Sequence, residues 1–225
     1  MEALSRDLAG VPVIVGGGLA GLMTALKLAP RPVILLAKTP LTEGAASAWA
    51  QGGIAAALGD DDHPSLHAND TLAAGDGLTD PAVANRIAAA APAAIVSLER
   101  LGVVFDRDAN GRLALGLEAA HARRRIVHAA GDGTGAAIMR ALAAVVRATP
   151  SITVIEGLEA RRLLVADRGI AGVLAAGPWS ACVLPSRQVV LATGGLGGLF
   201  AHTTNPLGAV GRGIALAARA GAVLA

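Results

Sequence analysis

Glycines near the start of the chain are spaced as in a phosphate-binding loop. Gly16, Gly18 and Gly21 follow the pattern G-x-G-x-x-G. The first glycine allows a tight turn, the second lets the backbone approach a pyrophosphate, and the third permits close packing of a helix on a strand. The phosphates would lie at the N-terminus of the following helix, where free N–H groups and the helix dipole favour an anion. An apolar run over 11–15 precedes the glycines and a helical pattern follows them, so the sequence predicts a dinucleotide site here.

The residue expected to hold the ribose of that dinucleotide departs from the usual pattern. In NAD-binding domains an Asp or Glu about 20 residues beyond the glycines accepts a hydrogen bond from a ribose hydroxyl. Here the second apolar run, 33–37, ends at Lys38, and the nearest acidic residue is Glu43. A basic residue at this point argues against a standard NAD site and leaves FAD or NADP open.

Two further segments combine glycines with small residues. The segment Trp49-Ala50-Gln51-Gly52-Gly53-Ile54 lies at the mouth of a short helical piece expected over 51–58, and its glycine pair could approach a flat ring system. Taken alone, it favours a plain loop with a glycine pair. An apolar strand over 187–192 runs into Thr193-Gly194-Gly195, where the backbone could approach the dinucleotide a second time or simply turn.

The remaining charged residues favour ordinary structural roles. Asp60-Asp61-Asp62 is expected in a solvated loop, and Arg123-Arg124-Arg125 either presents positive charge to a dicarboxylate or forms a solvated run. Asp132 and Thr134 are expected to cap a following helix. The histidines lack the spacing of metal ligands, so no metal site is predicted; those considered are His67, His121, His128 and His202.

Composition excludes several classes of protein. The chain has 225 residues, of which 53% are hydrophobic and 16% charged, so it can bury a sizeable core and is not disordered. A net charge of +2 with 2% aromatic residues gives no support for nucleic-acid binding. The single cysteine, Cys182, is expected in a buried strand and fits a reducing compartment. Apolar stretches over 169–186 and 188–211 are broken by prolines and glycines, so they indicate strands and loops and not membrane spans. We expect a cytoplasmic protein without a membrane partner.

The order of the expected elements predicts an α/β fold. Strand, glycine turn, helix and strand over 11–37 make one right-handed βαβ unit. The whole chain, 1–225, is expected to form a single Rossmann-like nucleotide-binding domain with a parallel sheet and a β-meander inserted before Leu191. Beyond the first unit we expect a loop over 38–63, helices over 80–101, 134–148 and 210–220, a hairpin over 103–116, and strands over 152–156, 160–166, 171–176 and 180–184.

Taken together, these motifs resemble the FAD-dependent family of the succinate dehydrogenase and fumarate reductase flavoproteins. The resemblance covers essentially the whole chain, in the family's order. Within the family, Glu118-x-x-His121 and the stretch Arg125-Ile126-Val127-His128-Ala129 point to the branch that oxidises L-aspartate more than to the dicarboxylate branch. The resemblance rests on 13–21, 42–44, 49–54, 70–75, 117–121, 125–129, 191–195 and 203–206.

The resemblance implies noncovalent FAD. The flavin-wrapping segment of the covalent branch carries a histidine, where this chain has only Ala and Ser. Lys38 would contact the adenosine side. The implied cofactor contacts are Gly16, Gly17, Gly18, Leu19, Ala20, Gly21, Lys38, Ala46, Ser47, Ala48, Trp49, Ala50, Gln51, Gly52, Gly53, Thr193, Gly194, Gly195 and Arg212.

The resemblance also implies a reaction. Glu118 would orient the substrate's amino group, because a carboxylate facing an ammonium distinguishes aspartate from succinate, and His121 would lie near the substrate. L-aspartate would be oxidised to iminoaspartate with oxygen or fumarate as acceptor. The product would pass to quinolinate synthase for NAD biosynthesis.

Departures from the family pattern keep two alternatives open. Ala119 and Ala120 stand where the family has glycines, and Arg212 replaces an Asp that contacts FAD. Family members are more than twice as long, so their capping and C-terminal helical domains are expected to lie outside this chain. The alternatives are a dicarboxylate dehydrogenase or reductase flavoprotein, and a truncated FAD-binding fragment without turnover.

Overall fold

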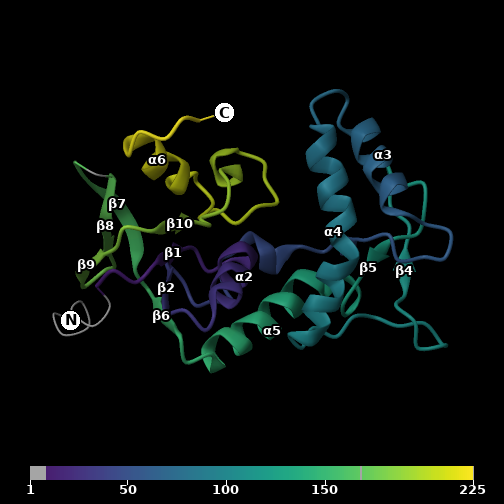
Figure 1. Ribbon diagram of the computed structural model, residues 1–225, viewed down its shortest axis with the longest axis horizontal. Coiled ribbons are helices and arrows are strands. Elements are labelled where there is room, and N and C mark those ends of the chain that lie inside the picture. The colour runs from purple at the N-terminus through teal and green to yellow at the C-terminus, as the bar shows by residue number, and fades with distance from the viewer. Residues whose placement is uncertain (1–8, 168, 225) are drawn as a thin grey trace. The chain divides into compact units, whose positions relative to one another are not determined.

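The computed structural model describes residues 9–167 and 169–224. It divides into two compact units. The first, here called the sheet unit, comprises Met1–Trp49 and Leu142–Ala225, and the second, called the helical unit, comprises Ala50–Ala141. Most of the helices and strands are labelled in Figure 1.

The centre of the sheet unit is a parallel sheet. Its strands are β1 (Val13–Val15), β2 (Val33–Ala37), β6 (Ile152–Glu156) and β10 (Val189–Leu191), in the spatial order β10-β1-β2-β6. Every residue of β1 and β2 is buried, as expected for parallel strands that are covered on both faces. The predicted parallel sheet is confirmed.

Helix α2 (Leu19–Leu28) joins β1 to β2 and buries Gly21, Leu22 and Ala25. Two glycines make this connection sterically feasible. A Cβ on Gly16, which has φ +121°, would collide with the carbonyl of Ala192, and a Cβ on Gly21 would collide with the carbonyl oxygen of Gly16. The predicted βαβ unit is therefore present, and its glycines are required for the reasons that the motif implies.

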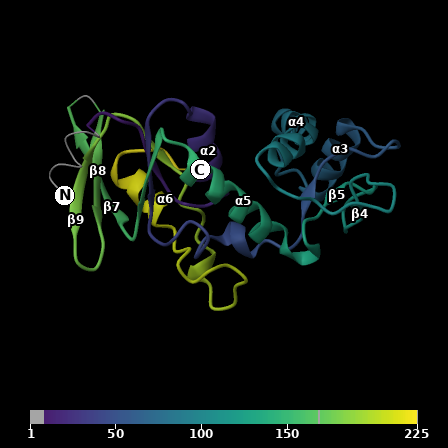
Figure 2. The same ribbon diagram turned by 90° about the horizontal axis from the view of Figure 1, so that it is seen from below.

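An antiparallel meander completes the core of the sheet unit. Strands β7 (Glu159–Ala166), β8 (Gly169–Ala176) and β9 (Ala181–Pro185) lie side by side in that order (Figure 2). Val173 and Leu184 from the meander are buried in one cluster with Ile34 of β2. The predicted meander before Leu191 is confirmed, although Cys182 in β9 is only partly buried. A 3-10 turn, η3 (Gly197–Leu199), and helix α6 (Arg212–Arg219) follow β10.

The helical unit contains helices α3 (Pro64–Ala74) and α4 (Pro81–Arg100), which pack on each other, and the first part of α5 (Thr134–Ala148). Its small antiparallel sheet has the order β3-β5-β4, with β3 at Ile54–Ala55, β5 at Ile126–Val127 and β4 at Leu115–Gly116. The 3-10 turn η2 (Gly131–Gly133) immediately precedes α5, and a further 3-10 turn, η1 (Ala46–Trp49), ends the first segment of the sheet unit.

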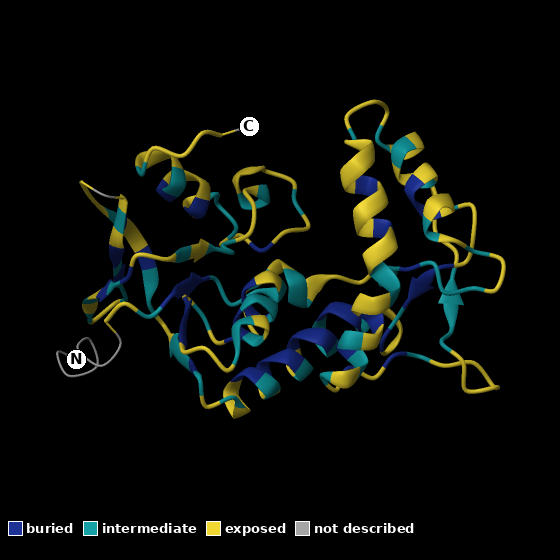
Figure 3. Ribbon diagram, viewed as in Figure 1, coloured by how far each residue is buried: buried dark blue, intermediate teal, exposed yellow. Residues whose placement is uncertain are grey.

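Among the described residues, α4 alone is long and apolar enough, by length and composition, to cross a membrane. Its buried residues are Ala84, Ala88, Ile95 and Leu98, whose spacing places them on one face. Most of its other residues are exposed (Figure 3). This pattern is typical of a helix that lies on the surface of a folded unit.

Local structure differs from the predictions at three places. Residues 51–58 are not helical, because Ile54 and Ala55 pair with Val127 and Ile126 of β5. Helix α3 was not expected, although His63 accepts a hydrogen bond from the N–H of Ser65 at its start and Pro64 occupies its first turn. The hairpin over 103–116 is shorter than predicted. It consists of one antiparallel bridge between Arg107 and Leu113, with the N–H of Asp108 donating to the carbonyl of Arg112 and the N–H of Ala114 to that of Asp106.

The last residues of the expected hairpin, Leu115 and Gly116, form β4, which pairs with β5 and not with the first half of the hairpin. The expected cap of α5 also differs. The hydroxyl of Thr134 accepts a hydrogen bond from the N–H of Ala129, which precedes the helix. Asp132 is exposed, and η2, in which it lies, has no side-chain cap, so Asp132 does not cap the helix.

Candidate functional site

A cavity of about 720 Å³ opens at the carboxyl ends of β1, β2 and β10. We call it the sheet-edge cavity. In open parallel sheets this edge is where ligands bind, and the volume lies within the range of about 300–1,000 Å³ that is usual for ligand pockets. The lining comes from 15–20, 36–40, 43–47, 158–160, 191–195, 205–206, 208–214, 216–217 and 224.

The glycine turn presents free backbone donors to this cavity. The N–H groups of Gly17, Gly18 and Ala20 donate to no other residue in the described part of the chain, while the N–H of Leu19 donates to Ser47 Oγ at 3.2 Å. These groups lie at the N-terminus of α2, where the helix dipole adds to their attraction for an anion. This end of the cavity therefore fits the pyrophosphate of a dinucleotide.

The second glycine segment borders the same cavity. Gly194 and Gly195 line it, and a Cβ built on either would meet no atom within 4 Å. A Cβ on Gly213, by contrast, would collide with Thr193 Oγ1, so the start of α6 packs directly on the end of β10. The strand-end glycines thus leave room for a ligand at this side of the cavity.

The structure brings most of the predicted cofactor residues together. Gly16, Gly17, Gly18, Leu19, Ala20, Lys38, Ala46, Ser47, Thr193, Gly194, Gly195 and Arg212 all line the sheet-edge cavity. Three others do not: Gly21 is buried beneath the turn, and Ala48 and Trp49 lie in η1, where Trp49 is 57% exposed. Ala50, Gln51, Gly52 and Gly53 belong to the helical unit.

Arg212 in the cavity is paired with a carboxylate. Its Nη1 donates to Glu159 Oε2 at 2.8 Å. The same carboxylate also lies 3.4 Å from Lys38 Nζ and 3.1 Å from Arg161 Nη2. Glu159 was not singled out from the sequence, because no motif includes it.

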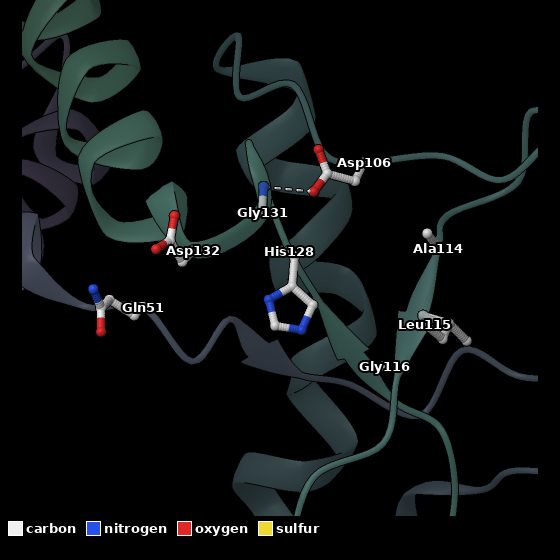
Figure 4. Close-up of a pocket in the computed structure, with 8 residues that line it drawn as sticks. All are labelled: Gln51, Asp106, Ala114, Leu115, Gly116, His128, Gly131 and Asp132. Carbon is white, nitrogen blue, oxygen red and sulfur yellow. Dashed lines mark hydrogen bonds between the residues drawn. The ribbon is translucent and has the colours of Figure 1, made fainter.

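The helical unit has a second cavity, of about 460 Å³. His128 points into it, and Asp106 accepts hydrogen bonds from the N–H groups of Ala130 at 3.0 Å and Gly131 at 2.9 Å (Figure 4). A Cβ on Gly53 or Gly116 would come within 3.0 Å of a ring nitrogen of His128, so both glycines make room for that ring. The lining residues are Gln51, Asp106, Ala114, Leu115, Gly116, His128, Gly131 and Asp132.

The two predicted catalytic residues lie on one exposed loop that follows β4. The N–H of His121 donates to the carbonyl of Glu118 at 3.2 Å, and Ala120 between them has φ +68°. The Glu118 carboxylate lies 3.8–3.9 Å from the position that a Cβ on Gly52 would take. Glu118 and the Gln51-Gly52-Gly53 segment, which are far apart in sequence, are therefore neighbours.

A buried ion network lies beneath this loop. Arg125 Nε and Nη2 donate to the two oxygens of Asp62 at 2.8 and 2.9 Å, and Arg125 Nη1 donates to Asp70 Oδ2 at 2.7 Å. The same Nη1 lies 3.3 Å from His121 Nδ1. Asp70 Oδ2 also accepts from the N–H of Ala122 at 2.8 Å. This network ties the loop to helix α3.

Two predictions about solvated charges are corrected by this network. The side chains of Arg125 and Asp62 are 0% exposed, whereas Arg124 and Asp60 in the same runs are exposed. A run of like charges gives no indication of which member turns inward. The partner that makes burial favourable lies on a distant segment.

The network shifts the pKa values of its members. The hydrogen bond from the N–H of Ala122, followed by that from Arg125, holds the pKa of Asp70 below its usual range against the opposing effect of burial. Burial opposes the charge of Arg125, but its bonds to Asp62 and Asp70 raise its pKa. Burial, and then the charge of Arg125, lowers the pKa of His67, whose ring packs edge-on against that of His121 at 5.6 Å.

Residues 12–225 match the family model described as FAD binding domain. The chain is 62% identical over 213 residues to an L-aspartate oxidase of Agrobacterium fabrum, a match that covers 95% of this chain and 41% of that protein. It is 59% identical over 225 residues to an L-aspartate oxidase of Mesorhizobium japonicum, covering 100% and 44%. The chain thus spans less than half the length of these curated relatives.

A solved structure is also similar. The structure of Mycobacterium smegmatis Sdh1 in complex with UQ1 superposes with a TM-score of 0.88 at 29% identity, covering 94% of this chain and 38% of that one. The parallel sheet, the glycine turn and the meander thus belong to an arrangement that is shared with a solved protein.

Proposed function

The chain belongs to the FAD binding domain family, whose cofactor is FAD, and from this membership we propose that it is part of an enzyme that oxidises L-aspartate to iminoaspartate. Identity of 59–62% to two L-aspartate oxidases supports the choice of substrate. The structural observation that carries the proposal is the placement of the Glu118 carboxylate beside Gly52 of the predicted flavin-wrapping segment.

FAD, when bound, would accept the hydride from the Cα of the substrate. The residues of this chain bind and orient the reactants. The free N–H groups at the start of α2 would hold the pyrophosphate, and Gly194 and Gly195 would allow close approach along the end of β10. We propose that this binding is noncovalent, because residues 46–53 contain no histidine.

Glu118 would determine which substrate is bound. A carboxylate forms a charge-assisted hydrogen bond with an ammonium group, which aspartate has and succinate lacks. His121 lies on the same loop and would border the substrate, while its Nδ1 stays close to Arg125. The buried network beneath the loop would keep both side chains oriented.

A dicarboxylate dehydrogenase or reductase is the second candidate. The similarity to the Sdh1 structure favours it, at 29% identity. The two candidates differ in whether an ammonium group is needed on the substrate, so one experiment separates them.

The acceptor, the next enzyme and the location belong to the same proposal. We propose that oxygen or fumarate takes the electrons, that iminoaspartate passes to quinolinate synthase for NAD biosynthesis, and that the protein acts in the cytoplasm. The single cysteine, Cys182, is free and is compatible with a reducing compartment.

Anaerobic reduction of the FAD-loaded full-length protein tests the substrate. L-aspartate should bleach the flavin absorption band and succinate should not. Glu118→Gln should lower the rate with aspartate by about 10- to 100-fold, the loss expected for one hydrogen bond to a charged group, and should change fumarate reduction much less. Glu99→Gln, in the last turn of α4 and paired with Arg107, is the matched control and should behave as the unaltered protein. Equal losses with aspartate and fumarate would contradict the role of Glu118, and reduction by succinate would favour the second candidate.

A further inference from the structure

The end of strand β2 is where a dinucleotide-binding domain ordinarily carries an acidic residue for the ribose. In this chain the residue directly after β2 is Lys38, which has no acceptor atom on its side chain. Lys38 lines the sheet-edge cavity, as does the exposed Glu43. The ribose of a bound dinucleotide therefore lacks its usual partner at this position of the strand.

The neighbouring strand brings a carboxylate to the same place. Strand β6 runs parallel to β2, and Ala37 at the end of β2 is paired with Glu156 at the end of β6. The chain then turns, and Glu159 begins β7. Its Oε1 lies 3.4 Å from Lys38 Nζ, and both residues line the sheet-edge cavity. The Glu159 carboxylate thus lies beside the end of β2, although it comes from a different segment of the chain.

The two carboxylate oxygens of Glu159 have different surroundings. Its side chain is 12% exposed, whereas those of Lys38, Arg161 and Arg212 are 49–50% exposed. Oε2 faces both guanidinium groups, that of Arg212 at 2.8 Å and that of Arg161 at 3.1 Å. Oε1 has Lys38 Nζ at 3.4 Å as an ion-pair partner but accepts no hydrogen bond from any residue that the structure describes. Because a carboxylate oxygen has about two lone-pair sites, Oε1 can still accept a hydrogen bond from a hydroxyl group.

We propose that Glu159 holds the ribose of the adenosine half of FAD, with Oε1 accepting a hydrogen bond from a ribose hydroxyl. Arg212 and Arg161 fix the orientation of the carboxylate. Lys38 remains beside it, 3.4 Å from Oε1. The inference rests on FAD binding in the sheet-edge cavity and adds a residue that recognises the adenosine half, so it predicts selectivity for FAD over flavins that lack adenosine.

Equilibrium binding of flavins to the full-length apoprotein tests the proposal, with flavin fluorescence as the readout. Glu159→Gln keeps the size of the side chain and removes the charge. It should weaken FAD binding by about 10-fold or more, the range for a hydrogen bond to a charged group, and leave FMN binding unchanged. Glu99→Gln is the matched control, since Glu99 also pairs with an arginine, Arg107, but does not line this cavity, and it should leave the affinity for FAD unchanged. Unchanged FAD affinity in Glu159→Gln, or an equal loss for FAD and FMN, would overturn the proposal.

A ligand variant gives a test that does not depend on how the altered protein folds. FAD analogues with a 2′-deoxy or a 3′-deoxy adenosine ribose should bind the unaltered protein about 10-fold more weakly in at least one case, and that loss should vanish in Glu159→Gln. If both analogues bind as FAD does, the carboxylate does not recognise the ribose. Neither readout uses aspartate, so this outcome leaves the proposed reaction untouched, while failure of the oxidation assay leaves the ribose contact standing.

Discussion

Arg125 and Asp62 form a fully buried ion pair in which two guanidinium nitrogens meet the two carboxylate oxygens at 2.8 and 2.9 Å. The residues are 63 positions apart in the chain. Such a pair is costly to desolvate, and its attraction is useful only while both partners remain. Arg125 also donates to Asp70, and Asp70 accepts a hydrogen bond from the N–H of Ala122 in the loop that carries Glu118 and His121. The buried ions therefore hold that loop in position.

Removing one partner of this pair should strongly destabilise the helical unit. Arg125→Met leaves the Asp62 carboxylate buried without its cation, which costs about 3–5 kcal/mol in comparable cases. Urea unfolding followed by circular dichroism measures the loss. Arg124→Met, at the exposed neighbour, should change the free energy of unfolding by no more than about 0.5 kcal/mol. Similar small effects of both substitutions would show that the buried pair does not stabilise the fold.

Asp70 should make the protein sensitive to acid. Its pKa is lowered in the folded state, mainly by the hydrogen bond from Ala122 and then by Arg125. Its contribution to stability is therefore present above the ordinary Asp pKa of about 3.9 and is lost as the pH falls below it. In Asp70→Asn the free energy of unfolding should depend less steeply on pH in that acid range. Asp60→Asn, whose side chain is 97% exposed, should keep the slope of the unaltered protein, and an unchanged slope in Asp70→Asn would contradict the prediction.

His67 should make the stability of the protein depend on pH closer to neutrality. Its pKa is lowered by burial, then by the charges of Arg125 and His121, against smaller opposing effects of Asp62 and Asp70. The unfolded chain then binds more protons than the folded one just below the ordinary His pKa of about 6.5, so stability should fall as the pH decreases through that value.

An NMR titration of the imidazole protons checks this directly. The His67 ring should titrate below the ordinary value, and His67→Gln should remove the corresponding part of the pH dependence of unfolding. His202→Gln, at an exposed position, should leave that dependence unchanged. A His67 pKa at or above the ordinary value would refute the expectation.

Ala120 should be replaceable by glycine with a gain in stability. Its φ of +68° lies in the left-handed region, where a Cβ costs roughly 1–2 kcal/mol. Ala120→Gly removes this strain but increases the entropy of the unfolded chain, which is worth about 0.4–1 kcal/mol. The net result should be a rise in the free energy of unfolding of up to about 1 kcal/mol. Ala119→Gly, in the same loop, should lower it slightly. Equal effects at both positions would show that the loop is not strained at Ala120.

Two glycines should separate folding from cofactor binding. A methyl group on Gly195 meets no atom within 4 Å and projects where the structure leaves space, so Gly195→Ala should weaken FAD binding with little change in melting temperature of the apoprotein. A methyl group on Gly21 collides with the backbone of Gly16, so Gly21→Ala should lower the melting temperature as well. Full FAD affinity in Gly195→Ala would indicate that FAD does not approach this part of the strand end.

Local patterns in the sequence were sufficient for the first βαβ unit, for α5 and for the meander. The strand over 33–37 and the helix over 134–148 have the predicted bounds, because apolar runs and helical spacing are properties of neighbouring residues. The glycine motif was equally local, since the turn, the strand before it and the helix after it lie within one short segment. Such features can be read without knowing what packs against them.

Contacts between distant segments were decided only by the tertiary structure. Ile54 became a strand because β5 lies beside it, and Arg125 became buried because Asp62 and Asp70 surround it. Glu159 entered the sheet-edge cavity because β6 pairs with β2, and it reaches Arg212 across 53 positions of sequence. These placements are stabilised by contacts with residues that are distant in sequence, which a local pattern does not reveal. The sequence therefore determined the cofactor-binding framework, and the packed fold decided which charged side chains surround it.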